Sequence, residues 1–489
     1  MKKALSVFSI VAAIFAAGCA VGPRYARPSA PTAPAWKSQA PWEQAAPKDS
    51  LSKGPWWEIF GDPQLNEYEK QLLAANQSLV AARDRLDQAR SLARIATAGM
   101  FPQVSTDPGL LRERLSGNRV LSGSTGPLTP VTQSQYAIPF ALNYEVDLFG
   151  RVRKNVEAAN ENLQATAADL QNVQLVLTAE LAADYFTLHE LDAEYLVVQE
   201  SVGYQRKGLE LVENRHKGGV ASGLEVAQQA SLLDATLTQL SLIQQSRAQY
   251  EHAIAVLLGQ PASNFSVSAA PLRATPPPIP LGVPSDVLER RPDIATAERL
   301  MAYQNSQVGI ARTAFYPHIT LAGQGGLVSR SIGDLFTAPS LFWAVGADAL
   351  QPIVQGGRNR ANLAATRSAY DEAVANYRQT VLTSFQQVED GISSLSALAQ
   401  ASTTQAAAVE EARKELTFAN NRYVGGVTTY LDVITAQSTL LNNERLAAQL
   451  LGQQMVTSVY LVKALGGGWD AKLIEKEQVH PEAKQVLQQ

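Results

Sequence analysis

The side chains that most often carry out catalysis or bind metals are few and scattered in this sequence. Its five histidines lie in separate segments of the 489-residue chain. His189 precedes Glu190, but Ala193 stands where a helical zinc-protease motif needs its second histidine. The sequence contains no nucleophile elbow and no phosphate-binding loop. We therefore expect no enzyme activity, no metal site and no cofactor.

One side chain does have a clear chemical context, and it is Cys19, the only cysteine. Two lysines, an apolar run and small residues precede it, which is the pattern of a secretory signal over residues 1–18. This segment resembles a bacterial lipoprotein signal, in which Cys19 becomes the lipidated first residue. The alternative is an ordinary signal peptide with an incidental cysteine. Ala20 and Val21 follow instead of Asp, which by resemblance to enteric lipoproteins favours the outer membrane.

Charge and hydropathy exclude two further classes of protein. Charged residues make up 18% of the chain and the formal net charge is −4, so we expect no nucleic-acid partner. After residue 19 no run of 18 apolar residues occurs, so we expect no transmembrane helix.

The residues after the signal divide into an arm and two similar halves. Residues 19–62 are rich in proline and predict an extended arm, which Trp56 and Trp57 should anchor on the body. The later segments follow in order: a first repeat (63–259), a proline-rich linker (260–284), a second repeat (285–466) and a polar tail (467–489).

Each repeat is predicted to contain a helix, two strands and a long helical hairpin. The first helices, 64–100 and 286–314, should end before Pro102 and Pro317, because a residue preceding proline avoids helical conformation. The clearest strand alternates between large apolar residues on one face, from Tyr136 to Leu148, and small or polar residues on the other. The four strand candidates are about 102–116, 134–148, 317–329 and 341–354.

The hairpins begin with long segments that lack proline, at 152–217 and 358–424. Apolar or small residues recur there at steps of three and four, which indicates a coiled-coil seam. Such a helix would be about 100 Å long at 1.5 Å per residue. No globular core needs a helix of that length.

A Gly-Gly-Val turn ends each long helix. The segments 215–226 and 422–433 share Arg, Gly-Gly-Val, Leu, an acid and Val in register, at an offset of 207 positions. The same offset aligns the halves without a gap from Gly150 to Gly259. This indicates an internal duplication in which helix length is constrained, as expected if both hairpins must end at one level.

Four strands cannot close a barrel, and open sheet edges are not tolerated in lipid. The smallest membrane barrels have about eight strands. If these strands enter a membrane, several chains must share one barrel. The alternative for the strand at 134–148 alone is a soluble sandwich.

The order of these elements, with several short motifs, resembles the TolC-like outer-membrane factors, in particular the lipoprotein branch of OprM and NodT type. The motifs are Trp-Trp-x-x-Phe-Gly-Asp-Pro-x-Leu at 56–65, Asp-Leu-Phe-Gly-Arg at 147–151, Pro-Ser-Asp-Val-Leu-Glu-Arg-Arg-Pro-Asp at 284–293 and Lys-Ala-Leu-Gly-Gly-Gly-Trp at 463–469. The resemblance covers essentially the whole mature chain.

The resemblance implies a mainly α protein with membrane β-strands. Three chains would form a 12-stranded barrel in the outer membrane, four strands from each, continued by a 12-helix α-barrel in the periplasm. A periplasmic adaptor would join it to an inner-membrane pump, expected to be of the RND type, for the efflux of drugs and toxic compounds. The channel of a type I protein secretion system is one alternative, and a lipid-anchored periplasmic scaffold without a pore is another. The sequence does not indicate the substrate.

The resemblance also assigns residues to the turns and to a gate. The adaptor-binding tips would be Gly218, Gly219, Val220, Gly425, Gly426 and Val427. The periplasmic gate would comprise Leu431, Asp432 and Thr435, with Glu225 and Gln228 at the equivalent places of the first repeat. Thr435 stands where related channels often carry a second acid. The alternative is that Asp432 forms a solvated ion pair with a neighbour such as Arg422.

The expected junction of barrel and helices carries four cations at helix starts, where the helix dipole disfavours them. Arg151, Arg153, Arg358 and Arg360 could instead reach lipid phosphates, or could be plain surface charge. Pro102 and Pro317 mark the same level.

Overall fold

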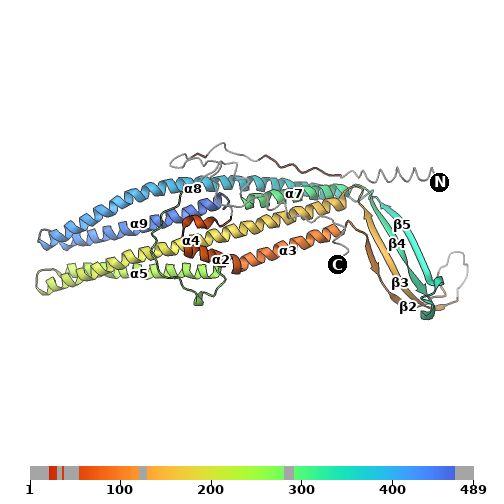
Figure 1. The fold of residues 1–489 in the computed structure, drawn as a ribbon, viewed down its shortest axis with the longest axis horizontal. Helices are drawn as coiled ribbons and strands as arrows, with labels where there is room; N and C mark the ends of the chain where they lie inside the picture. Colours follow the sequence, from red (N-terminus) through yellow and green to blue (C-terminus); the bar gives the residue numbers. More distant parts are fainter. Residues whose placement is uncertain (1–20, 30–35, 38–53, 120–128, 280–290, 468–489) are drawn as a thin grey trace.

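The computed structural model describes residues 21–29, 36–37, 54–119, 129–279 and 291–467. Figure 1 shows an elongated molecule with a β-sheet at one end and two helical hairpin turns at the other. The predicted signal at 1–18, Cys19, most of the proline-rich arm and the residues of the tail after Gly467 lie outside the described residues. Among those that are described, none of the helices combines the length and apolar character needed to cross a bilayer.

Four helices form the two hairpins. The first hairpin consists of α4 (Arg151–Lys217) and α5 (Gly223–Leu257), and the second of α8 (Arg358–Val424) and α9 (Tyr430–Ala464). The long members have 67 residues each and the return members have 35 each. Each boundary of the second hairpin lies 207 positions after its counterpart. The duplication seen in the sequence is therefore matched by the positions at which the helices begin and end.

Three shorter helices lie beside the parts of α4 and α8 that are nearer the sheet. They are α2 (Pro63–Ala75), α3 (Gln77–Ala98) and α7 (Pro292–Thr313). The prediction of one helix over 64–100 was wrong, because Asn76 has extended backbone between α2 and α3. Its side-chain oxygen accepts from the Leu79 amide at 3.0 Å and begins the second helix. The predicted start at 286 cannot be compared, because residues 280–290 lie outside the described part.

The hairpins and short helices meet end to end in the same way in both repeats. The Asn76 amide nitrogen donates to the carbonyl of Leu257, the last residue of α5, at 2.8 Å. Arg291, at the start of α7, donates to the carbonyl of Ala464, the last residue of α9, at 3.0 Å. Arg291 is 7% exposed and also pairs with Asp293 at 2.6 Å. The Arg-Pro-Asp motif therefore satisfies the open end of α9.

The sheet is antiparallel. Its strands are β1 (Gln103–Thr106), β2 (Gly109–Leu115), β3 (Val131–Val146), β4 (His318–Ser329) and β5 (Leu341–Leu350). β1 and β2 both pair with β3, which pairs with β4, which pairs with β5. The single strand predicted at 102–116 is thus interrupted at Asp107-Pro108. The last strand ends at Leu350 instead of 354, because Pro352 has no amide to donate to a ladder.

Cross-strand pairing gives the sheet one large apolar face and one small or polar face. Phe140 pairs with Gly325, which pairs with Trp343, and Leu142 and Val345 lie beside them on the same face. Trp343 and Val345 are each 76% exposed. Asn143, Gln324 and Asp348 belong to the opposite face. In the part of the chain that the structure describes, nothing therefore covers this wide apolar surface or the two outer edges of the sheet.

Pro139 lies inside this sheet, where proline normally weakens a ladder. It pairs with Gly326 of β4. A Cβ on Gly326 would lie 2.2 Å from the carbonyl oxygen of Ile138, so only glycine lets the strands approach here.

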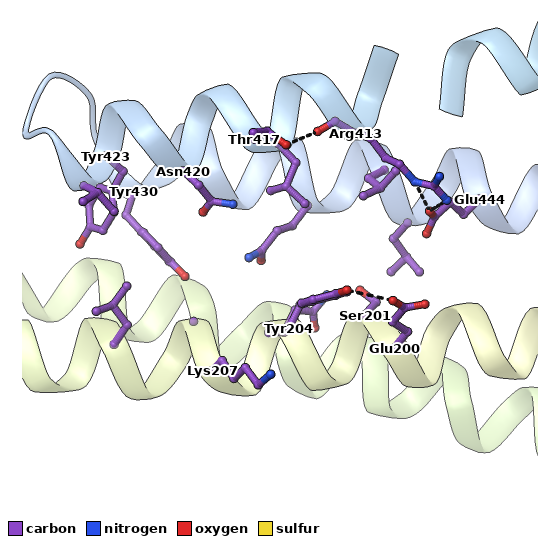
Figure 2. A pocket seen from close by; sticks show the side chains of 18 residues that line it. Glu200, Ser201, Tyr204, Lys207, Arg413, Thr417, Asn420, Tyr423, Tyr430 and Glu444 are labelled. Carbon is purple, nitrogen blue, oxygen red and sulfur yellow. Dashed lines mark hydrogen bonds and ion pairs between the residues drawn. The ribbon is translucent and has the colours of Figure 1, made fainter. Parts of the chain in front are cut away.

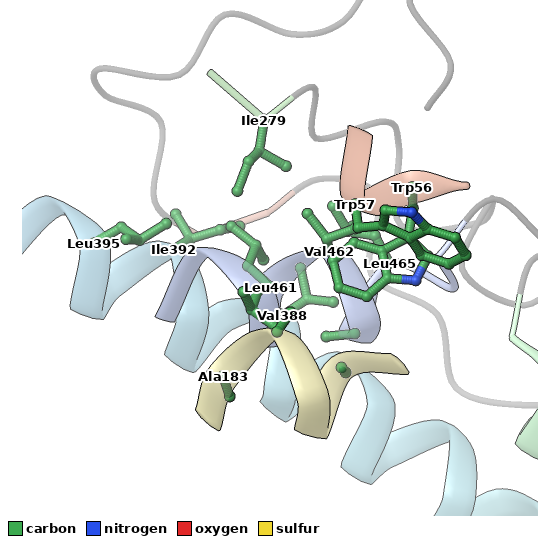
Figure 3. Close-up of a cluster of buried hydrophobic side chains, with 14 of the residues drawn as sticks. Trp56, Trp57, Ala183, Ile279, Val388, Ile392, Leu395, Leu461, Val462 and Leu465 are labelled. Atoms are coloured by element: carbon green, nitrogen blue, oxygen red, sulfur yellow. The ribbon is translucent and has the colours of Figure 1, made fainter. Parts of the chain in front are cut away.

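The largest apolar core lies at mid-length, where the arm, α2, α4, α7, α8 and α9 meet. Figure 3 shows Trp56 and Trp57 beside Val462 and Leu465 at the end of α9, with Leu461, Val388 and Ile392 farther along the same cluster. Trp56 belongs to η1 (Trp56–Phe60) and its indole donates to the Thr178 hydroxyl at 3.2 Å. The other short helices are η2 (Ala262–Asn264), η3 (Ile332–Asp334) and η4 (Ala338–Ser340).

Candidate functional site at the hairpin ends

The turn of each hairpin is a Schellman cap. Gly219 and Gly426 have left-handed backbone with φ of 74° and 72°. Val220 donates to the Arg215 carbonyl at 2.8 Å, and Val427 donates to the Arg422 carbonyl at 2.9 Å. Gly218 and Gly425, one residue earlier, complete each cap. Glycine is required at the left-handed position because a side chain would be strained there.

The two turns present an apolar rim at one end of the molecule. Val220 and Val427 are each 70% exposed, and Leu224 and Leu431, the second residues of the return helices, are 66% and 51% exposed. Val424 is 70% exposed at the end of α8. Exposed apolar groups gathered on one surface indicate a contact site for another molecule.

The predicted gate residues include Leu431 of this rim, and the others follow it or its counterpart along the return helices. Leu431, Asp432 and Thr435 are all exposed on α9, whereas Glu225 and Gln228 on α5 are half-buried. Asp432 accepts a hydrogen bond from the Thr428 hydroxyl. The ion pair with Arg422, considered as an alternative, is not formed among the described residues.

The two turns also pack against each other. The Tyr423 and Tyr430 rings meet edge to face at 4.8 Å, and the Arg215 guanidinium lies 4.7 Å from the centre of the Tyr423 ring. Val212 and Ala221 of the first hairpin complete the cluster. Burial raises the pKa of Tyr430 to about 12, so its hydroxyl keeps its proton at neutral pH.

Gly208 of α4 makes this contact possible. A Cβ at that position would lie 2.6 Å from the Tyr430 hydroxyl and 3.3 Å from the side-chain nitrogen of Gln229. Gln229 donates to the Gln205 carbonyl at 2.9 Å, which joins α5 to α4 at the same level. Tyr430 therefore rests directly on the backbone of the other hairpin.

Sequence reasoning did not find Gly208, Tyr423 or Tyr430. A signal was present in the repeat itself: at the offset of 207, Tyr423 corresponds to His216 and Tyr430 to Gly223. An aromatic pair in only one of two otherwise matched turns marks the side chains that must reach across to the other hairpin.

The same two hairpins meet again nearer mid-length through buried acids. Glu194 on α4 accepts from two of the three Arg445 guanidinium nitrogens, Nε at 2.7 Å and a terminal nitrogen at 2.5 Å. Glu190 packs against Gly452 of α9. Burial, and then the charge of Glu194, raise the pKa of Glu190 to about 7.

At the opposite end, the cations of the predicted junction differ between repeats. Arg151 pairs with Glu145, and Arg153 pairs with Asp147 at 3.2 Å. The Asp147 carboxylate also accepts from the Val152 amide, at 3.1 Å, and so satisfies the first turn of α4. These two arginines are thus held by carboxylates at the end of β3, which offsets the unfavourable helix dipole.

Arg358 and Arg360 lack such partners among the described residues and are exposed at the start of α8. At the offset of 207, Pro352 and Val354 replace the two carboxylates. Pro102 and Pro317 lie at the same level, where the chain passes from a short helix to a strand.

The arm returns to this junction. The Val21 amide donates to the Phe149 carbonyl at 3.1 Å, and Tyr25 donates to Glu298 of α7 at 2.8 Å. Residue 21 therefore lies where β3 passes into α4. Within the described residues, no group of three or more His, Cys, Asp or Glu could hold a metal ion.

Comparison with known proteins agrees with this architecture. The chain is 31% identical over 470 residues to the pyoverdine export outer membrane protein OpmQ of Pseudomonas aeruginosa, with 96% of this chain and 98% of that protein covered. It is 31% identical over 476 residues to the toluene efflux pump outer membrane protein TtgC of Pseudomonas putida, with 96% of each chain covered.

Solved structures give the same result. The structure of the outer-membrane channel OprN matches with a TM-score of 0.85 at 29% identity, covering 92% of this chain and 100% of that one. The family model described as outer membrane efflux protein matches two segments, 69–260 and 283–467, which correspond to the two repeats. With both halves of its duplication matched in this way, the chain belongs to the outer membrane efflux protein family.

Proposed function

We propose that this protein is the outer-membrane channel subunit of a tripartite efflux pump, and that it passes small molecules from a periplasmic adaptor and inner-membrane pump to the outside. The observation that carries the proposal is the separation of two surfaces: an apolar sheet with open edges at one end, and two level turns about 100 Å away, the length of a 67-residue helix.

The open edges support a homotrimer. Three copies of the sheet, with β1 and β2 counted as one interrupted strand, would close a barrel of twelve strands through the free edges of β5 and of β1 and β2, because lipid offers an unpaired edge no hydrogen bonds. The apolar face with Trp343 and Val345 would then face lipid, and the face with Asn143 and Gln324 would line the pore. Twelve hairpin helices would continue the duct into the periplasm.

The turn end supports adaptor docking and gating. The apolar rim around Val220 and Val427 suits the tip of a periplasmic adaptor, which would connect the channel to a pump of the RND type. Three Asp432 carboxylates around one axis would repel one another and attract cations. Such a ring would constrict the pore and make it prefer cations. Glu225 and Gln228 would form a wider and weaker ring.

The junction supports anchoring at the inner surface of the outer membrane. Lipid on Cys19, two residues before Val21, would lie beside the end of β3. Arg358 and Arg360 have no carboxylate partner among the described residues and would contact lipid phosphates at that level, whereas Arg151 and Arg153 are engaged by carboxylates.

Two experiments test the proposal. Unheated protein from the outer-membrane fraction should migrate on a gel as a trimer that heating converts to a monomer; a soluble monomer would refute the channel. Deleting the chain and profiling sensitivity to drugs and metals should reveal its substrates, whereas secretion defects without altered sensitivity would instead support a protein export channel.

A further inference from the structure

The apolar face of the sheet, which carries Trp343, becomes polar toward the end of the sheet that is farthest from the helices. β3 begins at that end and leads into α4 at its other end. Every second residue of a strand lies on the same face. On β3 this face is large and apolar from Tyr144 back to Tyr136, and the next two residues on it are Ser134 and Thr132.

Two arginines of β2 lie beside these hydroxyl residues. Arg112 pairs with Ser134, and Arg114 pairs with Thr132. Directly opposed residues of an antiparallel pair have their side chains on the same face of the sheet. Both arginines therefore belong to the apolar face, immediately beyond its apolar part, and both are exposed.

The neighbouring chain does not neutralise this pair of cations. Glu113 lies between them on β2, but on the opposite face, where it accepts from the side-chain nitrogen of Gln133 at 2.7 Å. Neither Arg112 nor Arg114 forms an ion pair among the described residues. The sequence between Glu113 and Glu145 contains no acidic residue at all. The far end of the apolar face is thus locally cationic in a chain whose net charge is −4.

The height of the arginines fits the boundary of a bilayer. Ser134 precedes Tyr144 by ten residues. At about 3.4 Å per residue and a tilt of about 40°, this length of strand spans about 26 Å of bilayer thickness. The apolar band of a membrane barrel is about 25 Å tall. If Tyr144 lies at the periplasmic boundary of the hydrocarbon, Arg112 lies at the outer boundary, at the level of the headgroups.

We propose that Arg112 and Arg114 bind a phosphate group of the phosphorylated glycolipid in the outer leaflet, while the acyl chains of that lipid lie along the apolar face below. A guanidinium group presents two parallel N–H donors that match two phosphate oxygens. The hydroxyls of Ser134 and Thr132 are placed to donate to the same headgroup. This inference rests on the proposed function, because it needs the apolar face to lie in lipid with the far end of the sheet outside.

The test is titration of the full-length, detergent-solubilised protein with diphosphoryl lipid A and with dephosphorylated lipid A, which has the same acyl chains. Bound lipid is counted by native mass spectrometry. The wild type should bind the diphosphoryl lipid at least about tenfold more tightly, as expected for charge-assisted hydrogen bonds. Inorganic phosphate at about 10 mM should not displace it, because the lipid is held by its acyl chains as well.

Variants assign the preference to the arginines. The double variant Arg112→Gln/Arg114→Gln should lose the preference for the phosphorylated lipid. Arg112→Lys/Arg114→Lys should keep part of it, because lysine retains the charge without the paired donors. Arg206→Gln/Arg378→Gln removes two exposed arginines from α4 and α8 and should leave the affinity within about twofold.

Four results would overturn the proposal: equal affinity for the two lipids, an unchanged preference in the glutamine variant of β2, an equal loss in the variant of α4 and α8, or displacement by inorganic phosphate. All four substituted arginines are exposed, and gel migration before and after heating shows whether each variant assembles as the wild type does. A wild-type trimer without the lipid preference would refute this inference alone, whereas a soluble monomer would refute the channel.

Discussion

The two hairpin turns have the same main chain and different side chains. Both end a 67-residue helix with a Gly-Gly-Val Schellman cap, and Val220 and Val427 are equally exposed. The first turn, however, carries His216, which bonds the carbonyl of Ala221 at 2.8 Å within its own turn. The second carries Tyr423 and Tyr430, which extend to the other hairpin.

This difference indicates that the two turns of the duplicated chain have different roles. The shared cap fixes the height of both turns, as expected if both meet one partner. The side chains differ, and Tyr423 and Tyr430 of the second turn make the contacts that join the two hairpins (Figure 2). The exposed acid Asp432 lies in the same turn, so hairpin packing and the proposed gate are close in sequence and in space.

The largest effect should come from removing the space that Tyr430 occupies. Gly208→Val should separate the turns, cost about 1–3 kcal/mol of stability and raise single-channel conductance, because the new side chain would overlap the Tyr430 hydroxyl. Gly203→Val is the matched control, since a Cβ there meets nothing within 4 Å on the same helix. Equal conductance in the two variants would show that this contact does not hold the turns together.

A second experiment separates the contact at the turns from the contact at mid-length. Folding raises the pKa of Glu190 to about 7, so its contribution to stability is fully present below the unfolded pKa near 4.5 and is lost as pH rises through 7. Lowering the pH from 8 to 5 should therefore strengthen the α4–α9 contact by an amount on the order of 1–3 kcal/mol per chain.

Glu190→Gln should remove that pH dependence of the unfolding temperature. Tyr430, whose pKa is about 12, should contribute none in this range. If the variant and the wild type show the same pH profile, the titrating group lies elsewhere.

A third prediction compares the acids of the two turns. Asp432→Ala should raise conductance in planar bilayers and lower cation preference, because it removes an exposed carboxylate from the proposed constriction. Glu225→Ala should change both less, since Glu225 is half-buried on α5. Unchanged conductance and selectivity in Asp432→Ala would show that Asp432 does not form the gate.

The smallest effect concerns the starts of the return helices. The Ser222 hydroxyl accepts from the Glu225 amide at 3.3 Å, whereas Thr429 at the equivalent position makes no side-chain cap bond. Ser222→Ala should cost about 0.5–1 kcal/mol and speed hydrogen exchange in the first turn of α5. Thr429→Ala should have almost no effect on α9; comparable losses in both would contradict the difference.

The local features were predictable because they depend on near neighbours. Proline-free length, steps of three and four, and the Gly-Gly turns indicated both hairpins, and alternation indicated the strand with Tyr136 and Leu142. Asn76 and Pro108 were missed as interruptions. The side chain of Asn76 bonds to the carbonyl of Leu257, about 180 residues away, and no local pattern shows that contact. The sequence pattern expected for one helix and for one strand continued across Asn76 and Pro108.

The site was predictable only in part for the same reason. The turn glycines and the exposure of Asp432 follow from local chain geometry. The contact of Tyr430 with Gly208 and the ion pair of Glu194 with Arg445 depend on which side chains meet when segments more than 200 residues apart pack together.

The sequence by itself determined the duplication, the equal lengths of the two hairpins and the two glycine turns, since helix length and capping are set by residues within a few positions of one another. Only the tertiary structure decided which side chains join the two hairpins at the turns and which buried acid meets α9 nearer mid-length. Those outcomes depend on packing between α4 and α9, which the chain brings together from more than 200 residues apart.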